Sequence, residues 1–345
     1  MSSLSPFYLR VILVRHGQSG NNALVESSGG WQAYHRNRTA DAPLTELGRN
    51  QAKKIGSFLA KMANESPIPI KRFYTSCMKR ALETSSLIYK ASIEIHKEGM
   101  QSRADIELRD ETIREVSSCS ILPFPQVFVD IFEIGGLFDR RVDANLDKKP
   151  DSSTWKGIPG LSRDEVKSLF PIIDVGSEIE PPLLSSKFTN YTSGTLSNNG
   201  WYLSDKKEEE NEGAARVIKI VEAFKALAVS LLIEERGKDA IKDVKKPLGV
   251  GVTPDGSQGK IHDGEAIILV CHGDFINVFL RACVGDPAMT LESIESGKGK
   301  GEGLQFAVNN CSISIVDFMP SDGTVRIIRV NDVRGVDDLL TGAPL

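Results

Sequence analysis

The stretch LVRHGQSGNN, residues 13–22, takes the chain from an apolar run to a cation and an imidazole. The residues YLRVILV at 8–14 are β-branched and nearly all apolar toward their end, which is typical of a buried strand. That strand is expected to end at Arg15 and His16. An arginine suits bidentate recognition of phosphate, so the end of this strand is a candidate anion site.

A second predicted strand ends in a similar way. The apolar run EAIILVC at 265–271 is followed by His272 and Gly273. In open α/β sheets, ligands collect at the carboxyl ends of the strands. We therefore expect His16 and His272 to face each other across one crevice, whereas a single histidine at a strand end more often has only a structural role.

Strands and helices alternate along most of the chain, which predicts an α/β fold: a three-layer α/β/α sandwich with a mostly parallel central sheet and a long inserted cap region. The predicted strands are 8–14, 70–76, part of 104–116, 265–271 and an antiparallel edge pair at 311–318 and 325–330. The predicted helices are 43–62, 77–91, 214–235 and 274–284, with Thr45 and Ser76 as the caps of the first two.

Several stretches interrupt this alternation. Residues 117–211 are rich in Pro, Gly, Ser and Asn and are interpreted as the cap insertion. Residues 237–264 carry charges, glycines and a TPDG turn signal, so we expect a flexible loop. The glycine-rich stretch at 295–303 is also expected to be a flexible loop. The stretch KKEEEN at 206–211 is interpreted as the solvated start of the following helix.

Composition limits the function further. The 345 residues are 40% hydrophobic and 26% charged with a formal net charge of −4, so the chain lacks the basic footprint of a nucleic-acid binder. We find no signal peptide and no apolar stretch of membrane-spanning length, and we expect a cytoplasmic protein with no membrane partner. The five cysteines are scattered, which argues against a zinc site. His35, His96 and His262 have no ligand-like partners in the sequence, and no dinucleotide or P-loop fingerprint is present, so we expect no metal and no cofactor.

Five motifs, in order, resemble those of the histidine phosphatase superfamily, which has a phosphoglycerate-mutase-like fold. The first is LVRHGQSGNN, similar to the family's apolar strand followed by Arg-His-Gly-x-Ser/Thr. The others are APLTELGRNQA at 42–52, YTSCMKRALETS at 74–85, IREV at 113–116 and ILVCHGDFI at 268–276. The resemblance covers roughly residues 8–116 and 213–330. It implies that residues 1–345 form one histidine-phosphatase-like domain, within which 117–211 is a cap and 237–264 a flexible loop.

The resemblance implies catalytic roles for the residues that match the family's motifs. His16 matches the nucleophile, which attacks phosphorus and forms a phosphohistidine, so that one difficult displacement becomes two easier ones. Arg15, Arg80 and His272 match the residues that hold the phosphoryl oxygens.

The first motif implies further phosphate-binding residues, and a later one implies the acid. Asn22 is expected to donate a hydrogen bond to the phosphate, and Gln18 and Ser19 to assist through side chain or backbone. Glu115, in IREV, matches the general acid, a role that needs a pKa raised by partial burial. Asp110 and Glu111 remain alternatives for this role, as does a solvated charged turn at 109–115.

The branch of the superfamily is less well defined by the motifs. Phosphoglycerate mutases carry a tryptophan at the position of Asn21 and a longer acidic signature than IREVSSCS. We therefore interpret the chain as a phosphatase, a phosphoric monoester hydrolase acting through a phosphohistidine on a phosphorylated small molecule. The alternatives are a phosphoglycerate-mutase-type phosphotransferase and a non-catalytic protein that binds a phosphorylated ligand.

The cap insertion is expected to set substrate choice. We hypothesise that Arg140, Arg141, Arg163, Trp201 or Tyr202 contributes to the mouth of the substrate site. The alternative is that these side chains only pack within the cap or solvate it.

Overall fold

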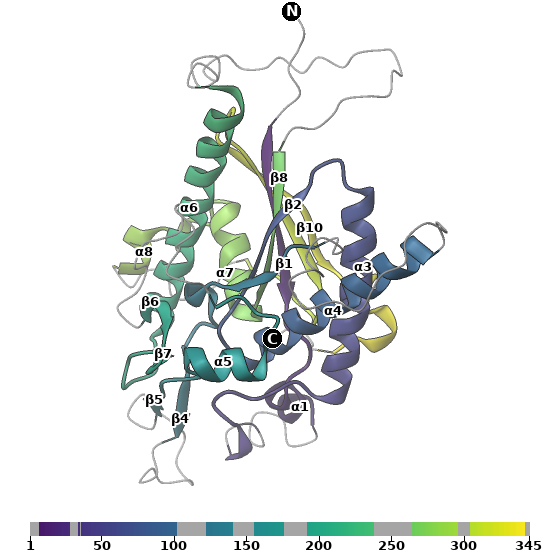
Figure 1. Cartoon of the computed structure of the whole chain (residues 1–345). Coiled ribbons are helices and arrows are strands. Elements are labelled where there is room, and N and C mark those ends of the chain that lie inside the picture. The colour runs from purple at the N-terminus through teal and green to yellow at the C-terminus, as the bar shows by residue number, and fades with distance from the viewer. Residues whose placement is uncertain are drawn as a thin grey trace, which may run out of the picture.

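The computed structural model describes residues 7–27, 34, 36–101, 122–140, 155–175, 192–237, 264–295 and 304–341 (Figure 1). Its centre is a six-stranded sheet with the order β10-β9-β1-β8-β2-β3. The strands are β1 (Tyr8–Arg15), β2 (Ile70–Thr75), β3 (Pro125–Val127), β8 (Gly264–Cys271), β9 (Ile313–Met319) and β10 (Thr324–Asp332). β1, β2, β3 and β8 run parallel to one another, whereas β9 pairs antiparallel with both β1 and β10, so the prediction of a mostly parallel sheet is confirmed.

Helices cover both faces of this sheet. The helices are α1 (Gly20–Glu26), α3 (Glu46–Glu65), α4 (Lys79–Gln101), α5 (Arg163–Leu169), α6 (Glu210–Arg236), α7 (Gly273–Cys283) and α8 (Leu291–Glu295). Figure 1 shows α3 and α4 on one side of the sheet and α6 and α7 on the other. The predicted three-layer α/β/α arrangement is therefore confirmed. Among the described helices, none is both long and apolar enough to cross a membrane.

The two central strands, β1 and β8, have no solvent-facing side. In β1, Val11 and Leu13 pack with the core beneath α6 and α7, whereas Ile12 and Val14 pack with the core beneath α3 and α4. Successive side chains of a strand point to opposite faces, so a strand between two helix layers needs an unbroken apolar run. That requirement explains the run at residues 11–14, and the run in β8 follows the same pattern.

Of the two predicted helix caps, one is confirmed and one is not. Thr45 caps α3, and its hydroxyl accepts from the Gly48 N–H over 3.1 Å, as predicted. Ser76 does not cap α4, which begins three residues later, at Lys79. The Ser76 hydroxyl instead hydrogen-bonds with His272 Nε2 over 2.8 Å and accepts from the Met78 N–H, before the helix, over 3.4 Å, so this prediction was wrong.

The C-terminal strands form the expected antiparallel pair. β9 and β10 pair in register from Met319 opposite Thr324, with irregularities further along β10. The strand predicted within 104–116 lies outside the described residues, and so does all of the predicted loop 237–264 except its two end positions.

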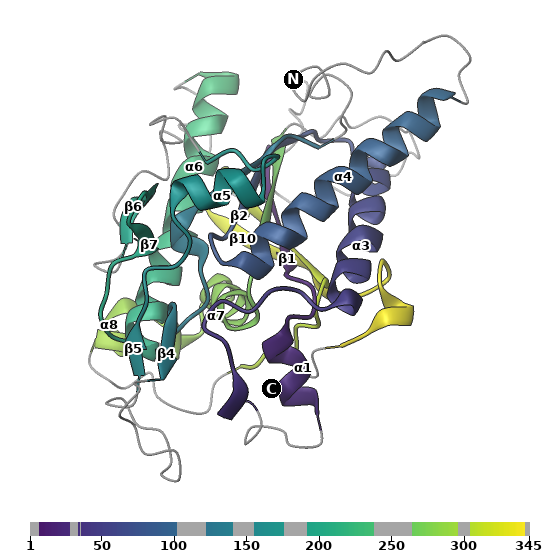
Figure 2. The ribbon, with the colours of Figure 1, turned by 60° about the horizontal axis from the view of Figure 1, so that its bottom comes forward.

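The described parts of the predicted cap contain small elements beside the main sheet. They are β3, the antiparallel pairs β4 (Phe138–Arg140) with β5 (Trp155–Gly157) and β6 (Thr192–Ser197) with β7 (Gly200–Tyr202), and helix α5. Figure 2 shows both small sheets on the α6 side of the molecule, away from α3. β3 differs because it pairs with β2 and is the edge strand of the central sheet. The cap boundaries at 117 and 211 remain a prediction.

Candidate active site

The carboxyl ends of β1 and β8 bring the two histidines together. These neighbouring parallel strands are in register, with Arg15 opposite Cys271. The N–H of His16 continues the ladder by donating to the Cys271 carbonyl over 3.0 Å. The rings of His16 and His272 lie with their centroids 5.1 Å apart, and the two residues are only 2% and 0% exposed. Two strands that end at the same level therefore place the two imidazoles in contact.

The His16 imidazole has one defined tautomer. Its Nδ1 lies 2.7 Å from the carbonyl oxygen of Gly17, and because a carbonyl only accepts, Nδ1 must carry the hydrogen. Burial, together with the nearby charges of Arg80 and Arg15, holds the pKa of His16 well below its ordinary value. The imidazole is therefore neutral at pH 7, with a lone pair on Nε2. Arg80 donates from Nε to this Nε2 over 3.1 Å.

Two buried nitrogens beside this pair have no hydrogen-bond partner among the described residues. One is Nε of Arg15, whose guanidinium also donates to the Val308 carbonyl. The other is Nδ1 of His272, whose Nε2 hydrogen-bonds with the Ser76 hydroxyl over 2.8 Å. Burial, followed by the charge of Arg80, lowers the pKa of His272 well below its ordinary value. Buried polar atoms are normally paired, so unpaired nitrogens beside two guanidinium groups indicate a site for an anion.

The loop after His16 packs backbone against backbone on the start of α3. A Cβ added at Gly17 would lie 2.4 Å from the carbonyl oxygen of Gly48. A Cβ added at Gly48 would lie 2.1 Å from the carbonyl oxygen of Gln18. Both contacts are shorter than a side chain tolerates, so the two glycines of the first and second motifs allow α3 to support the His16 loop directly.

The remaining first-motif residues have local structural partners. Ser19 caps α1 and Asn22 completes a capping box, with the Ser19 N–H donating to Asn22 Oδ1 over 3.0 Å. The Gln18 side chain donates from Nε2 to Glu26 over 2.6 Å, and its Oε1 accepts from the Thr45 hydroxyl over 2.7 Å. Because its amide is used in this way, we do not assign Gln18 a phosphate contact through its side chain.

Asn310 supports the same loop, and no motif in the sequence predicts it. It is fully buried and donates from Nδ2 to the carbonyl of His16 over 2.9 Å. Its Oδ1 accepts from the Thr341 hydroxyl over 3.2 Å. Asn310 lies just before β9, outside the recognised motifs. Its role becomes visible only through these partners.

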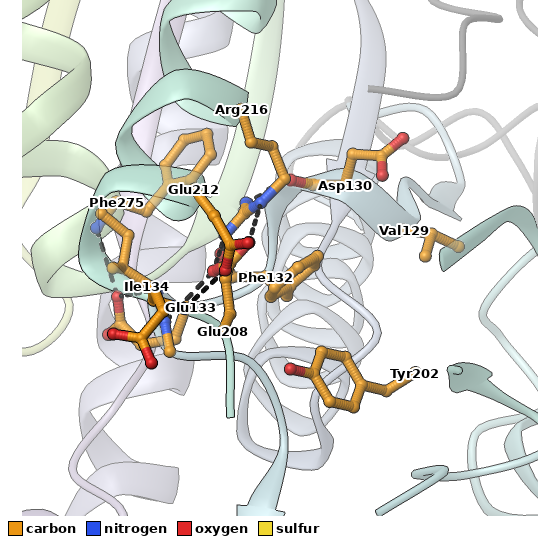
Figure 3. Close-up of polar contacts among 12 residues, drawn as sticks. Val129, Asp130, Phe132, Glu133, Ile134, Tyr202, Glu208, Glu212, Arg216 and Phe275 are labelled. Carbon is orange, nitrogen blue, oxygen red and sulfur yellow. Dashed lines mark hydrogen bonds and ion pairs between the residues drawn. The ribbon is translucent and has the colours of Figure 1, made fainter. Parts of the chain in front are cut away.

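The predicted general acid, Glu115, lies outside the described residues, as do its alternatives Asp110 and Glu111. Among the described residues, the structure brings Glu133 to the site. Its Oε1 accepts from the N–H of Phe275, near the start of α7, over 3.2 Å, and from the N–H of Ile134 over 3.1 Å (Figure 3). The carboxyl is thus held against the helix that begins directly after His272.

The environment of Glu133 favours its protonated form. Burial, followed by the negative charge of Asp274, raises the pKa of Glu133 to about 7, against the opposing effects of Arg80 and Arg15. Such a pKa suits a group that gives and takes a proton near neutral pH. Sequence analysis missed this residue because it assigned 117–211 to a cap. The available signal was a pair of acids, Asp130 and Glu133, within the apolar run VFVDIFEIGG at 127–136.

Two of the side chains expected at the substrate mouth are elsewhere. Trp201 and Tyr202 are 0% and 1% exposed and belong to a separate apolar core with Phe132, so the hypothesis was wrong for them. Arg163, at the start of α5, is partly exposed. Arg141 and the side chain of Arg140 lie outside what the structure describes. Within the described ranges, no group of three His, Cys, Asp or Glu side chains is arranged to hold a metal ion.

A mostly parallel α/β sheet with a neutral histidine and two arginines at its carboxyl edge has the features of a phosphoryl-transfer site. In a comparison with family models, residues 11–101 match the histidine phosphatase superfamily (branch 1). The resemblance predicted from the motifs is therefore confirmed over this part of the chain. A comparison with curated proteins finds no match.

Solved structures of similar proteins include both phosphatases and a mutase. The ecdysone phosphate phosphatase from Bombix mori in complex with tungstate is 15% identical, with 94% of this chain and 93% of that chain covered and a TM-score of 0.41. The phosphoserine phosphatase from Entamoeba histolytica in complex with 3-phosphoglyceric acid is 15% identical, with coverages of 95% and 99% and a TM-score of 0.38. The phosphoglycerate mutase from Bacillus anthracis is 15% identical, with coverages of 97% and 98% and a TM-score of 0.34. These values are low, so the fold assignment rests on the strand order and not on these likenesses.

Proposed function

We propose that this chain is a phosphatase that hydrolyses a phosphate monoester through a phosphohistidine on His16. The observation that carries the proposal is the state of His16: a buried, neutral imidazole whose Nδ1 is bound to a carbonyl and whose Nε2 faces a guanidinium. A lone pair beside fixed positive charge suits attack on the phosphorus of an anion.

In the first step, His16 Nε2 forms a bond to phosphorus while the bond from phosphorus to the ester oxygen breaks. Arg15, Arg80 and His272 bind the phosphoryl oxygens and stabilise the charge that spreads over them in the transition state. The unpaired nitrogens of Arg15 and His272 support this role. Asn22 is proposed to assist by donating from its side-chain Nδ2, because the N–H groups of Ser19 and Asn22 are both used within the capping box.

Glu133 is the proposed general acid of this first step, in place of Glu115. It gives its proton to the ester oxygen as that oxygen leaves, which makes the alcohol and leaves a carboxylate. The raised pKa of Glu133 supports this role, since a carboxyl with its ordinary pKa has almost no proton to give at pH 7.

In the second step, water attacks the phosphorus of the phosphohistidine. The Glu133 carboxylate takes a proton from that water, the bond between phosphorus and Nε2 breaks, and the electron pair returns to His16. Inorganic phosphate leaves and Glu133 is again protonated. The cycle consumes one water and one ester and needs no other reactant.

A phosphorylated small molecule is the proposed substrate. Phosphoserine and 3-phosphoglyceric acid occur in the names of similar structures, and they are substrate classes to test first. Mutase chemistry is the second candidate because the solved structures include a mutase. It would appear as phosphoryl transfer between phosphoglycerates faster than release of phosphate.

The experiment is a phosphate-release assay on an aryl phosphate and a panel of small phosphate esters. The wild type and His16→Ala are compared, together with Glu133→Gln and Glu115→Gln. We expect phosphate release by the wild type, a loss of at least roughly 1,000-fold in His16→Ala, and a large loss in Glu133→Gln but not Glu115→Gln. Equal rates in the wild type and His16→Ala would contradict the phosphohistidine. Binding without turnover on the whole panel would favour a phosphate-ligand binder.

A further inference from the structure

The start of α6 contains an ion pair that is sealed from solvent. The Arg216 and Glu208 side chains are 1% and 0% exposed. Arg216 donates from Nε to Glu208 Oε1 over 3.1 Å and from its NH2 group to Oε2 over 2.9 Å. The sequence predicts a solvated helix start at 206–211, and that prediction was wrong for Glu208.

This pair is not explained by fold stability alone. Removing two charges from water is costly, and replacing a buried ion pair with apolar residues of similar size is often neutral or stabilising. A guanidinium with its planar fork is, however, well suited to hold several oxygens in fixed positions. The groups that the pair contacts beyond itself therefore indicate what it does.

Those contacts converge on the chain segment that carries Glu133 (Figure 3). Arg216 also donates to the carbonyls of Asp130 and Phe132, over 2.6 and 3.1 Å. Its guanidinium lies 3.6 Å from the centre of the Phe132 ring. On the other side of Glu133, the N–H of Gly135 donates to Glu208 over 3.2 Å. The pair thus binds main-chain groups both before and after Glu133.

The helix backbone is shaped for this contact. A Cβ added at Gly213 would lie 2.8 Å from a methyl group of Ile134 and 2.9 Å from Glu208 Oε2. Only a glycine at this position lets α6 approach both the segment and the ion pair without a shift. Close packing and hydrogen bonds therefore fix the same short segment, 130–135.

We propose that Arg216 and Glu208 are positioning residues that hold Glu133 in reach of the ester oxygen and of the attacking water. The inference rests on the proposed function, since it assumes that Glu133 is the acid. Neither residue contacts the histidine pair in any hydrogen bond of the described chain, and each acts through the main chain on either side of Glu133. We call the Arg216–Glu208 pair the clamp. A misplacement of about 1 Å in a catalytic group lowers rates by roughly 100-fold, so a clamp that fixes the position of Glu133 is important for the rate.

The test compares two esters that differ in their need for an acid. Phenyl phosphate has a poor leaving group and needs proton donation, whereas 2,4-dinitrophenyl phosphate has a good one. The variant Arg216→Met/Glu208→Gln removes both charges together, so that no lone buried charge remains. We expect its kcat/KM to fall by roughly 10- to 100-fold for phenyl phosphate. For 2,4-dinitrophenyl phosphate we expect a change of less than about 3-fold, since that ester does not depend on Glu133.

Two further variants keep the test decisive. Gly213→Ala displaces the segment without removing a charge, and it is expected to show the same selective loss if the double variant does not fold. Arg281→Met/Asp286→Asn removes another nearly buried ion pair, linked over 2.8 Å at the far end of α7. This control removes a comparable pair of charges away from Glu133 and is expected to leave the ratio of the two rates unchanged.

The outcomes separate this inference from the proposed function. Equal losses on both esters in the folded double variant, or a shift of the ratio in the control, would overturn the positioning role. If Glu133→Gln shows the selective loss and the double variant does not, the clamp fails while the proposed function stands. If Glu133→Gln itself shows no selective loss, the acid assignment fails and the clamp fails with it.

Discussion

The guanidinium of Arg80 donates to Nε2 of His16 over 3.1 Å, so the proposed nucleophile and its cation are in direct contact. Arg80 lies in the first turn of α4, where main-chain N–H groups also favour an anion. We predict that Arg80→Ala lowers kcat/KM for an aryl phosphate by roughly 100- to 1,000-fold.

The same substitution is expected to raise the pKa of His16, because the charge of Arg80 is the main electrostatic cause that lowers it after burial. NMR titration of the imidazole measures this change. Arg49→Ala is the matched control, since Arg49 pairs with Glu83 near the surface of α3 and α4. An unchanged His16 pKa in Arg80→Ala would contradict the account of this contact.

The pH dependence of activity follows from the raised pKa of Glu133. A general acid acts in its protonated form, so kcat/KM for phenyl phosphate should fall as the pH rises through about 7. In Glu133→Gln, this fall in kcat/KM on the basic side of the pH profile (the basic limb) should be absent, and the residual kcat/KM should be low. A basic limb that persists unchanged in Glu133→Gln would assign it to another group.

The same carboxyl affects stability in a predictable direction. Its pKa is about 7 in the folded chain and 4.5 in its ordinary state, so the folded chain binds the proton more tightly. The free energy of unfolding of the wild type should therefore fall, relative to that of Glu133→Gln, as the pH rises from 4.5 to about 7. Urea unfolding of both proteins across this range measures the difference, and a constant difference would argue against the raised pKa.

The backbone contact between Gly48 and the His16 loop gives a stability prediction. Gly48→Ala places a methyl group 2.1 Å from the Gln18 carbonyl oxygen, so we expect a loss of about 1–3 kcal/mol in the free energy of unfolding. Gly20→Ala is the control, because its Cβ would come no nearer than 4.0 Å to another group, at Ala42. Equal stability of the two variants would show that the loop moves freely away from α3.

The sequence predicted the parts of this molecule that obey local rules. The apolar runs before Arg15 and His272 are long enough to define strands buried on both faces, and Thr45 caps its helix by a contact three residues away. Ser76 was misassigned because the helix begins later, at Lys79, and the Ser76 hydroxyl pairs with the distant His272, which the helix pattern does not reveal.

The site residues that depend on long-range contacts could not be predicted from the sequence. Glu133 lies against the start of α7 because β3, a strand only three residues long, returns the chain to the sheet edge beside β2. Asn310 and Arg216 depend on partners that are distant in sequence. Such residues carry no pattern of spacing, so only the fold identifies them.

The phosphohistidine on His16 is tested most directly by trapping the phosphoenzyme. Glu133→Gln is mixed with 2,4-dinitrophenyl phosphate, quenched in alkali, where phosphohistidine survives, and digested for mass spectrometry. We expect one phosphoryl group on the peptide that contains His16, and none in the double variant His16→Ala/Glu133→Gln. A phosphoryl group on any other residue, or turnover by the wild type with no phosphoenzyme in either protein, would contradict it.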